Sequence, residues 1–156
     1  MSFLENFGIT TGQGKHYEEI IYAMTLLYNN WYNRLSAYLK HFQLTPSQMN
    51  VLMVVKHQAS TDGISQVDIG KKMIATASNL TRLLDKLEEE ELVTREAEAG
   101  DRRVNLVRIT LKGSTLLDQV WPGYTRELER CVQGLDIEEQ KKVSEIFKKW
   151  LKIIVN

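Results

Sequence analysis

The sequence contains a single cysteine, Cys131, and only two prolines in 156 residues. One cysteine cannot form an intrachain disulfide, so a secreted scaffold held together by disulfides is excluded. Long hydrophobic runs are also missing: the longest nearly apolar stretch, "IIYAMTLLY", is far shorter than the roughly 20 residues that span a bilayer. The N-terminal residues show neither the basic nor the apolar segment of a signal peptide. These absences predict a cytoplasmic protein without a membrane segment.

An excess of charge of either sign is missing as well, since 20 lysines and arginines balance 20 aspartates and glutamates. The global charge therefore argues neither for nor against a nucleic-acid partner, and only the local distribution can. The sequence has no glycine-rich phosphate loop, no nucleophile elbow and no cluster of metal ligands. The histidines, His16, His41 and His57, lack the i, i+4 spacing of a helical metal site. We predict no enzymatic activity, no cofactor and no metal.

Helical periodicity dominates what is present. Between His16 and Phe42 there is no glycine or proline, and apolar residues recur at steps of three and four. This pattern predicts one long amphipathic helix. Cap signals predict the start of three further helices, at Thr45 with Gln48, at Ser65 with Asp68, and at Thr76. The short link between the last two helices, at 65–73 and 76–91, is typical of a helix-turn-helix.

The pattern then changes to two short strands, at 92–97 and 104–110, with "EAGDRR" between them, which predicts a β-hairpin. Thr110 is the expected cap of the next helix, in which Pro122 should cause a kink or an interruption. The last helix should bury its apolar residues, namely Val143, Ile146, Phe147, Trp150, Leu151 and Ile154. We therefore predict a mainly α fold with a small β-hairpin (α+β): a winged helix-turn-helix lobe with helical extensions from both ends of the chain.

Polar residues gather at the beginning of the fourth helix. The residues expected to face base edges and phosphates are Thr76, Ala77, Ser78, Asn79, Arg82 and Lys86. Small side chains allow close approach to DNA, and Asn and Arg form bidentate contacts with adenine and guanine. The alternative is that Thr76, Ser78 and Asn79 serve only as helix caps.

Local charge favours the DNA-binding interpretation. From Gly70 to Leu87, Lys71, Lys72, Arg82 and Lys86 stand against Asp85 alone. From Ala99 to Lys112, Arg102, Arg103, Arg108 and Lys112 stand against Asp101 alone. The acids of Glu88–Glu91 are interpreted as a solvated helix end without a function. The alternative for Arg102 and Arg103 is that they are solvated loop charges.

The block "ISQVDIGKKMIATASNLTRLLDKLEEEELVTREAEAGDRRVNLVRITLKG" resembles the MarR family of bacterial transcriptional regulators. Its most specific part is the wing motif Asp-x-Arg, here Asp101 and Arg103, followed by a strand and "ITLKG". The resemblance extends over residues 16–154. It implies a homodimer in which residues 16–42 and 113–154 form a helical dimerisation region and residues 45–112 form the DNA-binding domain. The apolar helices themselves, with Trp31, Trp121 and Trp150, favour pairing over the alternative of packing within one chain.

The resemblance also implies roles for single residues. Arg103 would enter the minor groove, Asp101 would hold the shape of the wing, and Arg102 would at most contact phosphate. Two-fold symmetry would place two recognition helices about 34 Å apart on a pseudo-palindromic operator in double-stranded DNA. Whether Arg108 contacts DNA or faces the dimer lobe is left open.

The expected function is a dimeric DNA-binding repressor that a small-molecule ligand releases. Weak candidates for an aromatic ligand site are Tyr28, Trp31, Tyr32 and Tyr38. Cys131 is expected to be a small buried hydrophobe and not a redox sensor. The alternative is a winged-helix dimer that acts as a protein-interaction module, which the zero net charge and the Glu88–Glu91 run would favour.

Overall fold

The computed structural model describes residues 3–10, 12, 14–60, 62–73, 79–98 and 101–154, with the side chains of 3, 98 and 101–104 excepted. Its elements are η1 (Phe3–Phe7), α1 (His16–Lys40), α2 (Pro46–Gln58), β1 (Ile64–Ser65), α3 (Gln66–Lys72), α4 (Leu80–Glu89), β2 (Val93–Glu98), β3 (Asp101–Ile109), α5 (Leu111–Val132) and α6 (Ile137–Ile154). Two compact units divide the chain, a helical unit (1–31 with 125–156) and a winged unit (32–124). α1 and α5 each contribute to both.

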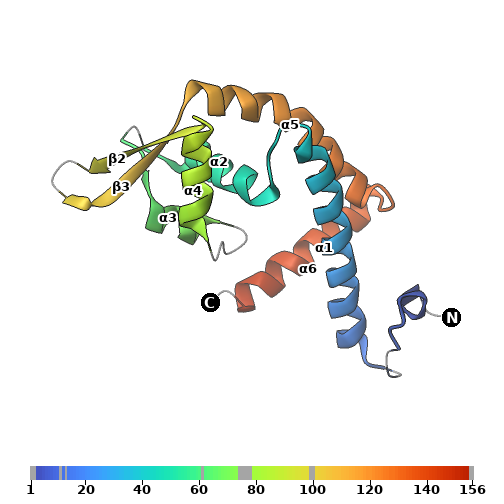
Figure 1. Cartoon of the computed structure of the whole chain (residues 1–156). Helices are drawn as coiled ribbons and strands as arrows, with labels where there is room; N and C mark the ends of the chain where they lie inside the picture. The colour runs from blue at the N-terminus through green and yellow to red at the C-terminus, as the bar shows by residue number, and fades with distance from the viewer. Residues whose placement is uncertain are drawn as a thin grey trace. The chain divides into compact units, whose positions relative to one another are not determined.

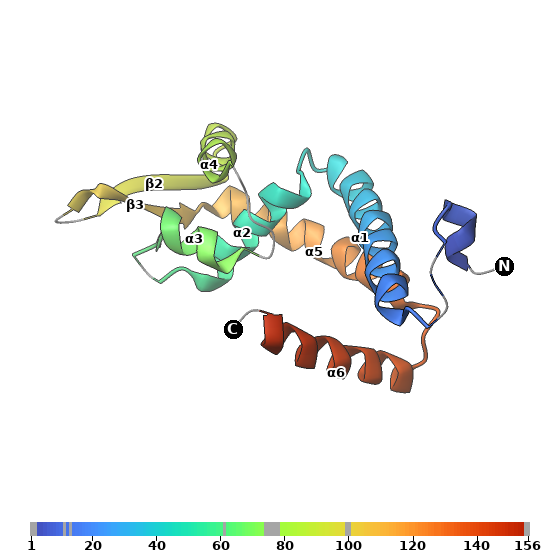
Figure 2. The same cartoon turned by 90° about the horizontal axis from the view of Figure 1, so that it is seen from below.

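The winged unit contains a three-stranded antiparallel sheet in the order β1-β3-β2 (Figure 1 and Figure 2). The predicted hairpin is confirmed as β2 and β3, in which Val93 pairs with Ile109. β1 was not predicted; it pairs with β3 through Ile64 opposite Val107. A strand of two residues is too short to show a periodicity in the sequence. Its pairing with β3 depends on the register of distant segments. The mainly α fold class with a small sheet is confirmed.

The core of the winged unit collects apolar side chains from every layer. The side chains that solvent does not reach include Leu52, Ile69, Leu84, Leu87 and Val107, which come from α2, α3, α4 and β3. Because these elements share one core, burial fixes the face that each helix turns outward.

Local capping chemistry explains where α2, α3 and α5 begin. Thr45 and Gln48 form the predicted capping box of α2, and the Ser65 hydroxyl accepts from the Asp68 amide at 3.1 Å. Thr110 accepts from the Gly113 amide at 3.0 Å at the start of α5. α4 differs from the prediction: Thr76 lies outside the described residues, and the described helix has Asn79 at its N-cap and begins at Leu80.

Two helices end in a left-handed residue that is not glycine. After α4, Glu91 has φ 58°, its amide bonds to the Glu88 carbonyl at 2.9 Å, and the Leu92 amide bonds to the Leu87 carbonyl at 2.8 Å. This is a Schellman motif, in which buried Leu87 and Leu92 supply the usual hydrophobic contact. Gln43, with φ 56°, occupies the same position after α1.

α5 continues through Pro122 from Leu111 to Val132, so the predicted interruption is absent. Proline removes one backbone donor, but the flanking turns are held by tertiary contacts. The Tyr38 hydroxyl donates to the Val120 carbonyl at 2.8 Å. A Cβ on Gly123 would overlap this hydroxyl and the Tyr38 ring, so glycine allows the tyrosine to lie against α5.

α6 has no buried residue in the chain described alone, and the prediction that it buries its apolar face is wrong for the single chain. Ile146 is 63% exposed and Leu151 58%. Cys131 is also exposed, which contradicts the expected burial. The physical reason is that the described chain places too few apolar groups against these positions to exclude water from them.

Candidate nucleic-acid interface

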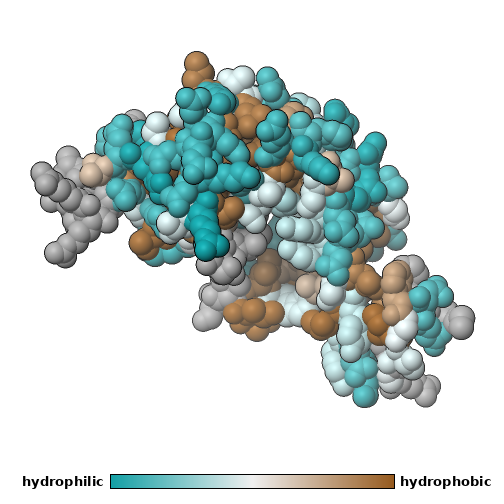
Figure 3. Space-filling model, in the orientation of Figure 1, coloured by the Kyte–Doolittle hydropathy of each residue, from teal (hydrophilic) through white to brown (hydrophobic). Residues whose placement is uncertain are grey.

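α4 turns one face to the core and the other to solvent. Leu84 and Leu87 are fully buried, while Thr81, Arg82 and Lys86 are exposed. Figure 3 shows hydrophilic side chains, in teal, covering the part of the surface that α4 forms. The exposed face therefore offers cationic and polar groups from a rigid helix, as direct contact with DNA requires.

Asn79 is exposed and stands at the N-cap of α4 without a capping hydrogen bond from its side chain. For this residue, the alternative that the amide serves only as a cap is therefore not supported. Thr76, Ala77 and Ser78 lie outside the described residues. Arg82 follows Asn79 by three positions, so both stand on one side of the first turn.

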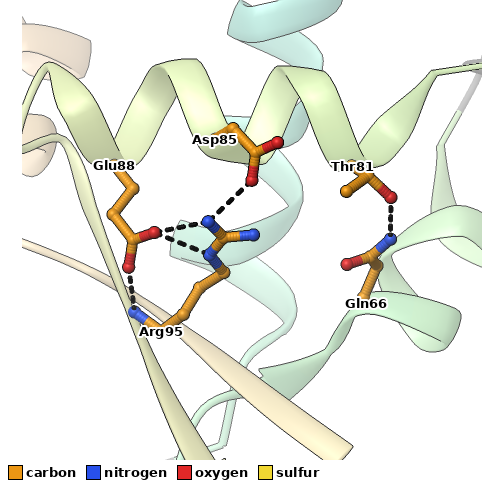
Figure 4. Close-up of polar contacts among 5 residues, drawn as sticks. All are labelled: Gln66, Thr81, Asp85, Glu88 and Arg95. Atoms are coloured by element: carbon orange, nitrogen blue, oxygen red, sulfur yellow. Dashed lines mark hydrogen bonds and ion pairs between the residues drawn. The ribbon is translucent and has the colours of Figure 1, made fainter.

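α3 and α4 are linked by a side-chain hydrogen bond. The Gln66 amide nitrogen donates to the Thr81 hydroxyl at 2.8 Å (Figure 4). Lys71 and Lys72 are less available than their charge suggests, because Lys71 pairs with Asp68 at 3.0 Å and Lys72 donates to Gln58 at 3.3 Å. The hydrogen bond from Ser65, followed by that from Lys71, holds the pKa of Asp68 below its usual value.

Arg95 on β2 binds the C-terminal half of α4. Its Nε donates to Glu88 at 2.8 Å, its terminal nitrogen lies 2.7 Å from Asp85, and its backbone amide donates to Glu88 at 3.2 Å (Figure 4). The hydrogen bond with Glu88 is the largest of the causes that raise the pKa of Arg95. Glu88 is thus an anchor for β2, and its interpretation as a solvated charge without a function is wrong.

Two of the three other acids at this helix end are also engaged. Glu90 lies 3.9 Å from Lys86, and Glu91 lies 3.2 Å from Lys112. Sequence reasoning missed Arg95 and the role of Glu88. The available signal was the i, i+3 spacing of Asp85 and Glu88, which puts both carboxylates on one side of the helix, with Arg95 on the strand that follows.

Arg108 is held within the sheet. Its Nε donates to the Asp62 carbonyl at 3.0 Å, and a terminal nitrogen donates to Glu96 at 2.6 Å. These contacts hold the Arg108 side chain against the neighbouring strand β2 and the loop before β1, and whether it also contacts DNA stays open.

The backbone of Asp101, Arg102 and Arg103 forms the beginning of β3, and Glu98 pairs with Asp101 after a bulge at Ala97/Glu98. The sequence placed these residues in the turn between the strands, which is wrong for the backbone because pairing resumes beyond the bulge. Their side chains lie outside the description, so the roles of Asp101, Arg102 and Arg103 stay predictions.

The four aromatic residues proposed for a ligand site have different surroundings. Tyr28 and Trp31 contact each other at 5.9 Å between ring centroids, in the helical unit. Tyr38 packs against Phe42 at 5.3 Å and donates to Val120, which is a structural role. Tyr32 lines a cavity of about 350 Å³ in the winged unit.

That cavity also has polar and cationic walls. Lys40, Gln48 and Lys86 line it together with Tyr32. The Gln48 side chain is buried, its oxygen accepts from the Thr45 amide at 2.9 Å, and its amide nitrogen lacks a hydrogen-bond partner among the described residues. A buried hydrogen-bond donor without a partner costs free energy. An acceptor placed beside it would remove this cost.

Comparisons with known proteins agree with this geometry. Residues 44–104 match the sequence model of the MarR family. The chain is 28% identical to the HTH-type transcriptional regulator MhqR of Bacillus subtilis (strain 168) over 131 residues, 84% of this chain and 88% of the relative. A MarR-like transcription regulator from Bacillus cereus ATCC 10987 matches with a TM-score of 0.81 at 22% identity, covering 89% of this chain and 98% of the other. A mutant MarR from Escherichia coli, crystallised with operator DNA, matches with a TM-score of 0.78 at 21% identity, covering 90% and 99%.

A helix pair followed by a basic two-stranded hairpin places the chain in the class of winged helix-turn-helix proteins. Within that class, the chain is similar to the MarR family of transcriptional regulators. Proteins of this family are DNA-binding transcription factors and not enzymes. No helix among the described residues is long and apolar enough to cross a membrane.

Proposed function

We propose that this regulator binds a pseudo-palindromic operator in double-stranded DNA as a homodimer. In each protomer α4 enters the major groove, where Asn79, Arg82 and Lys86 contact base edges and phosphates together with Thr76, Ala77 and Ser78. Arg103 enters the flanking minor groove, Asp101 holds the wing, and Arg102 contacts phosphate. The observation that carries the proposal is the two-faced character of α4, which buries Leu84 and Leu87 and exposes Arg82 and Lys86 beside the wing.

The proposed dimerisation region combines residues 16–42 and 113–154. Its support is the uncovered apolar surface of the helical unit, where Met24, Phe147, Trp150, Leu151 and Ile154 line a purely apolar groove. In Figure 3, hydrophobic side chains in brown gather around the C-terminal end of α6. A second copy of the chain would cover such a surface, and interfaces of this obligate kind bury roughly 2,000 Å² or more.

We further propose that the regulator is a repressor and that a small aromatic ligand releases it from DNA. The cavity that Tyr32 lines is the best supported site for this ligand. Lys86 belongs both to this cavity and to the exposed face of α4. A ligand that engages Lys86 would withdraw a cation from the DNA face, which couples ligand binding to DNA release.

The direct test is titration of the protein with its own upstream intergenic DNA at several salt concentrations. We expect sequence-preferring binding whose affinity falls with salt, because phosphate contacts release counterions. Loss of both the preference and the salt dependence would contradict the proposal. Ligand release is tested separately, by adding small aromatic acids and phenols to the preformed complex and measuring dissociation.

The protein-interaction alternative loses its main support. Glu88, Glu90 and Glu91 are engaged with Arg95, Lys86 and Lys112 of the same chain. They do not form an unpaired acidic surface that awaits a basic partner. Partner binding that is tight and insensitive to substitution of Arg82 and Arg103 would restore this alternative.

A further inference from the structure

Arg95 joins the wing to the recognition helix α4 at its base. The side chain is largely buried, with 22% of it exposed, and it reaches two carboxylates that stand one turn apart on α4. The backbone amide of the same residue donates to Glu88. One residue of β2 is therefore fixed to α4 through both its main chain and its side chain (Figure 4).

The contacts of Arg95 with Asp85 and Glu88 form a strong polar interaction, which we call the Arg95 clamp. Charge-assisted hydrogen bonds to carboxylates are roughly twice as strong as neutral ones, and the planar guanidinium fixes direction as well as distance. The donors that face Asp85 and Glu88 are occupied, so they do not serve a phosphate at the same time. The cation also offsets the negative charge that these two acids would otherwise present beside the DNA face.

Because the clamp lies at the base of the wing, the position of the wing tip depends on the geometry of the contacts that Arg95 makes. Glu98 on β2 pairs with Asp101 near the tip, so at about 3.3 Å per residue this pair lies roughly 10 Å along β2 from Arg95. A tilt of about 20° at the base would move this pair by about 3.4 Å, which is the rise of one base pair. A change of that size at Arg95 would therefore change which base-pair step the wing reaches.

We infer that Arg95 is a positioning residue that sets the spacing between the major-groove half-site read by α4 and the minor-groove tract reached by the wing. The inference rests on the proposed DNA binding and goes beyond it, because it assigns spacing specificity to a residue that contacts no DNA. Glu88 and Asp85 are its partners in this role.

Arg108 provides a matched control. It is an arginine in the same sheet, and it also binds a glutamate, Glu96, and a backbone carbonyl, that of Asp62. These contacts connect β3 to β2 and to the loop before β1, and none of them reaches α4. Substituting Arg108 thus removes the same charge from the wing and leaves the clamp in place.

The experiment selects DNA from a library in which the distance between the half-site core and a flanking A·T tract is varied. Full-length wild type, R95M, R108M and E88Q are compared, with thermal unfolding measured for each. We expect wild type and R108M to select one spacing. R95M and E88Q should accept spacings one base pair shorter or longer, with about tenfold weaker binding at the optimum. E88Q keeps Arg95 and its charge, so it decides the question even where R95M folds poorly.

Salt dependence separates positioning from direct contact. The slope of log K against log salt should be unchanged in R95M, whereas loss of a phosphate contact would reduce it by about one. An unchanged spacing preference in both R95M and E88Q, or a reduced slope in R95M, would overturn the inference while wild-type binding stands. Failure of wild type to bind any DNA sequence would overturn the proposed function, and the inference with it.

Discussion

At the scale of single residues, the contacts of each arginine separate its possible roles better than a count of charge does. Arg95 and Arg108 are both held by acids of the same chain. Arg82 is exposed on α4 beside Asn79. An arginine whose donors are already satisfied gains little from a phosphate, because the new contact must replace the old one. The basic residues of the wing and α4 are therefore unequal as candidates for DNA contact.

Arg103 is the residue at which this distinction is most directly tested. We expect Arg103→Ala to weaken operator binding by about 1–3 kcal/mol, the scale of a good groove contact. Arg102→Ala should cost less and reduce the slope of log K against log salt by about one, as removal of a phosphate contact does. Fluorescence anisotropy at several salt concentrations measures both quantities. Equal losses for the two variants would contradict the separate roles assigned to them.

At the scale of elements, the end of α4 carries a conformation that its residue does not favour. Glu91 is left-handed, with φ 58°, and a side chain at such a position costs about 1–2 kcal/mol relative to glycine. The surrounding hydrogen bonds of the Schellman motif and the buried Leu87 and Leu92 hold the residue in place. The exit from α4 to β2 is therefore held by local hydrogen bonds and by the burial of Leu87 and Leu92.

We expect Glu91→Gly to raise the free energy of unfolding by roughly 1 kcal/mol, because glycine adopts this backbone without strain. The lost pair with Lys112 is exposed and is worth little. Glu91→Ala is the matched control, since it removes the same pair and keeps the Cβ. Thermal or urea unfolding measures both. A gain in the alanine variant equal to that in the glycine variant would show that strain at Glu91 is not the cause.

The contact of α1 with α5 in the winged unit depends on the absence of a side chain at Gly123. We expect Gly123→Ala to destabilise the protein by about 1–3 kcal/mol, as overpacking does, because Tyr38 must leave its hydrogen bond to Val120. Gly134→Ala is the control: a Cβ there meets nothing within 4 Å. Urea unfolding of both variants is the measurement, and similar midpoints for the two would refute the argument.

The features that the sequence predicted correctly are those determined by neighbours in the chain. The capping box of α2, the Ser65 cap of α3 and the Thr110 cap of α5 follow from side chains three residues apart. β1 and the Arg95 clamp depend on distant segments that meet only after folding, so periodicity gave no sign of them. The interruption expected at Pro122 is absent for the same reason, since tertiary contacts outweigh one lost hydrogen bond in α5. The wing charges were placed in the turn because the bulge at Ala97/Glu98 leaves no local signal.

At the scale of the whole molecule, the helical unit leaves more apolar surface uncovered than single exposed side chains account for. Ile146 and Leu151 are mostly exposed, and the second of them belongs to the apolar groove with Met24 and Trp150. Large contiguous apolar patches on soluble proteins mark interaction surfaces. A second copy of the chain is the proposed occupant, because two-fold pairing would also place two copies of α4 on one operator.

Leu151→Glu tests this proposal with an unusually clear contrast. If Leu151 stays exposed, a charged replacement changes the free energy of unfolding by no more than about 0.5 kcal/mol. If a second copy covers it, the charge must be desolvated at several kcal/mol, and the dimer dissociates. We expect the second outcome: a monomer by light scattering, and operator affinity at least tenfold weaker because each monomer holds one half-site. Lys148→Glu, which changes a solvated charge on the same helix, should remain dimeric. A dimeric Leu151→Glu with normal affinity would move the interface away from α6.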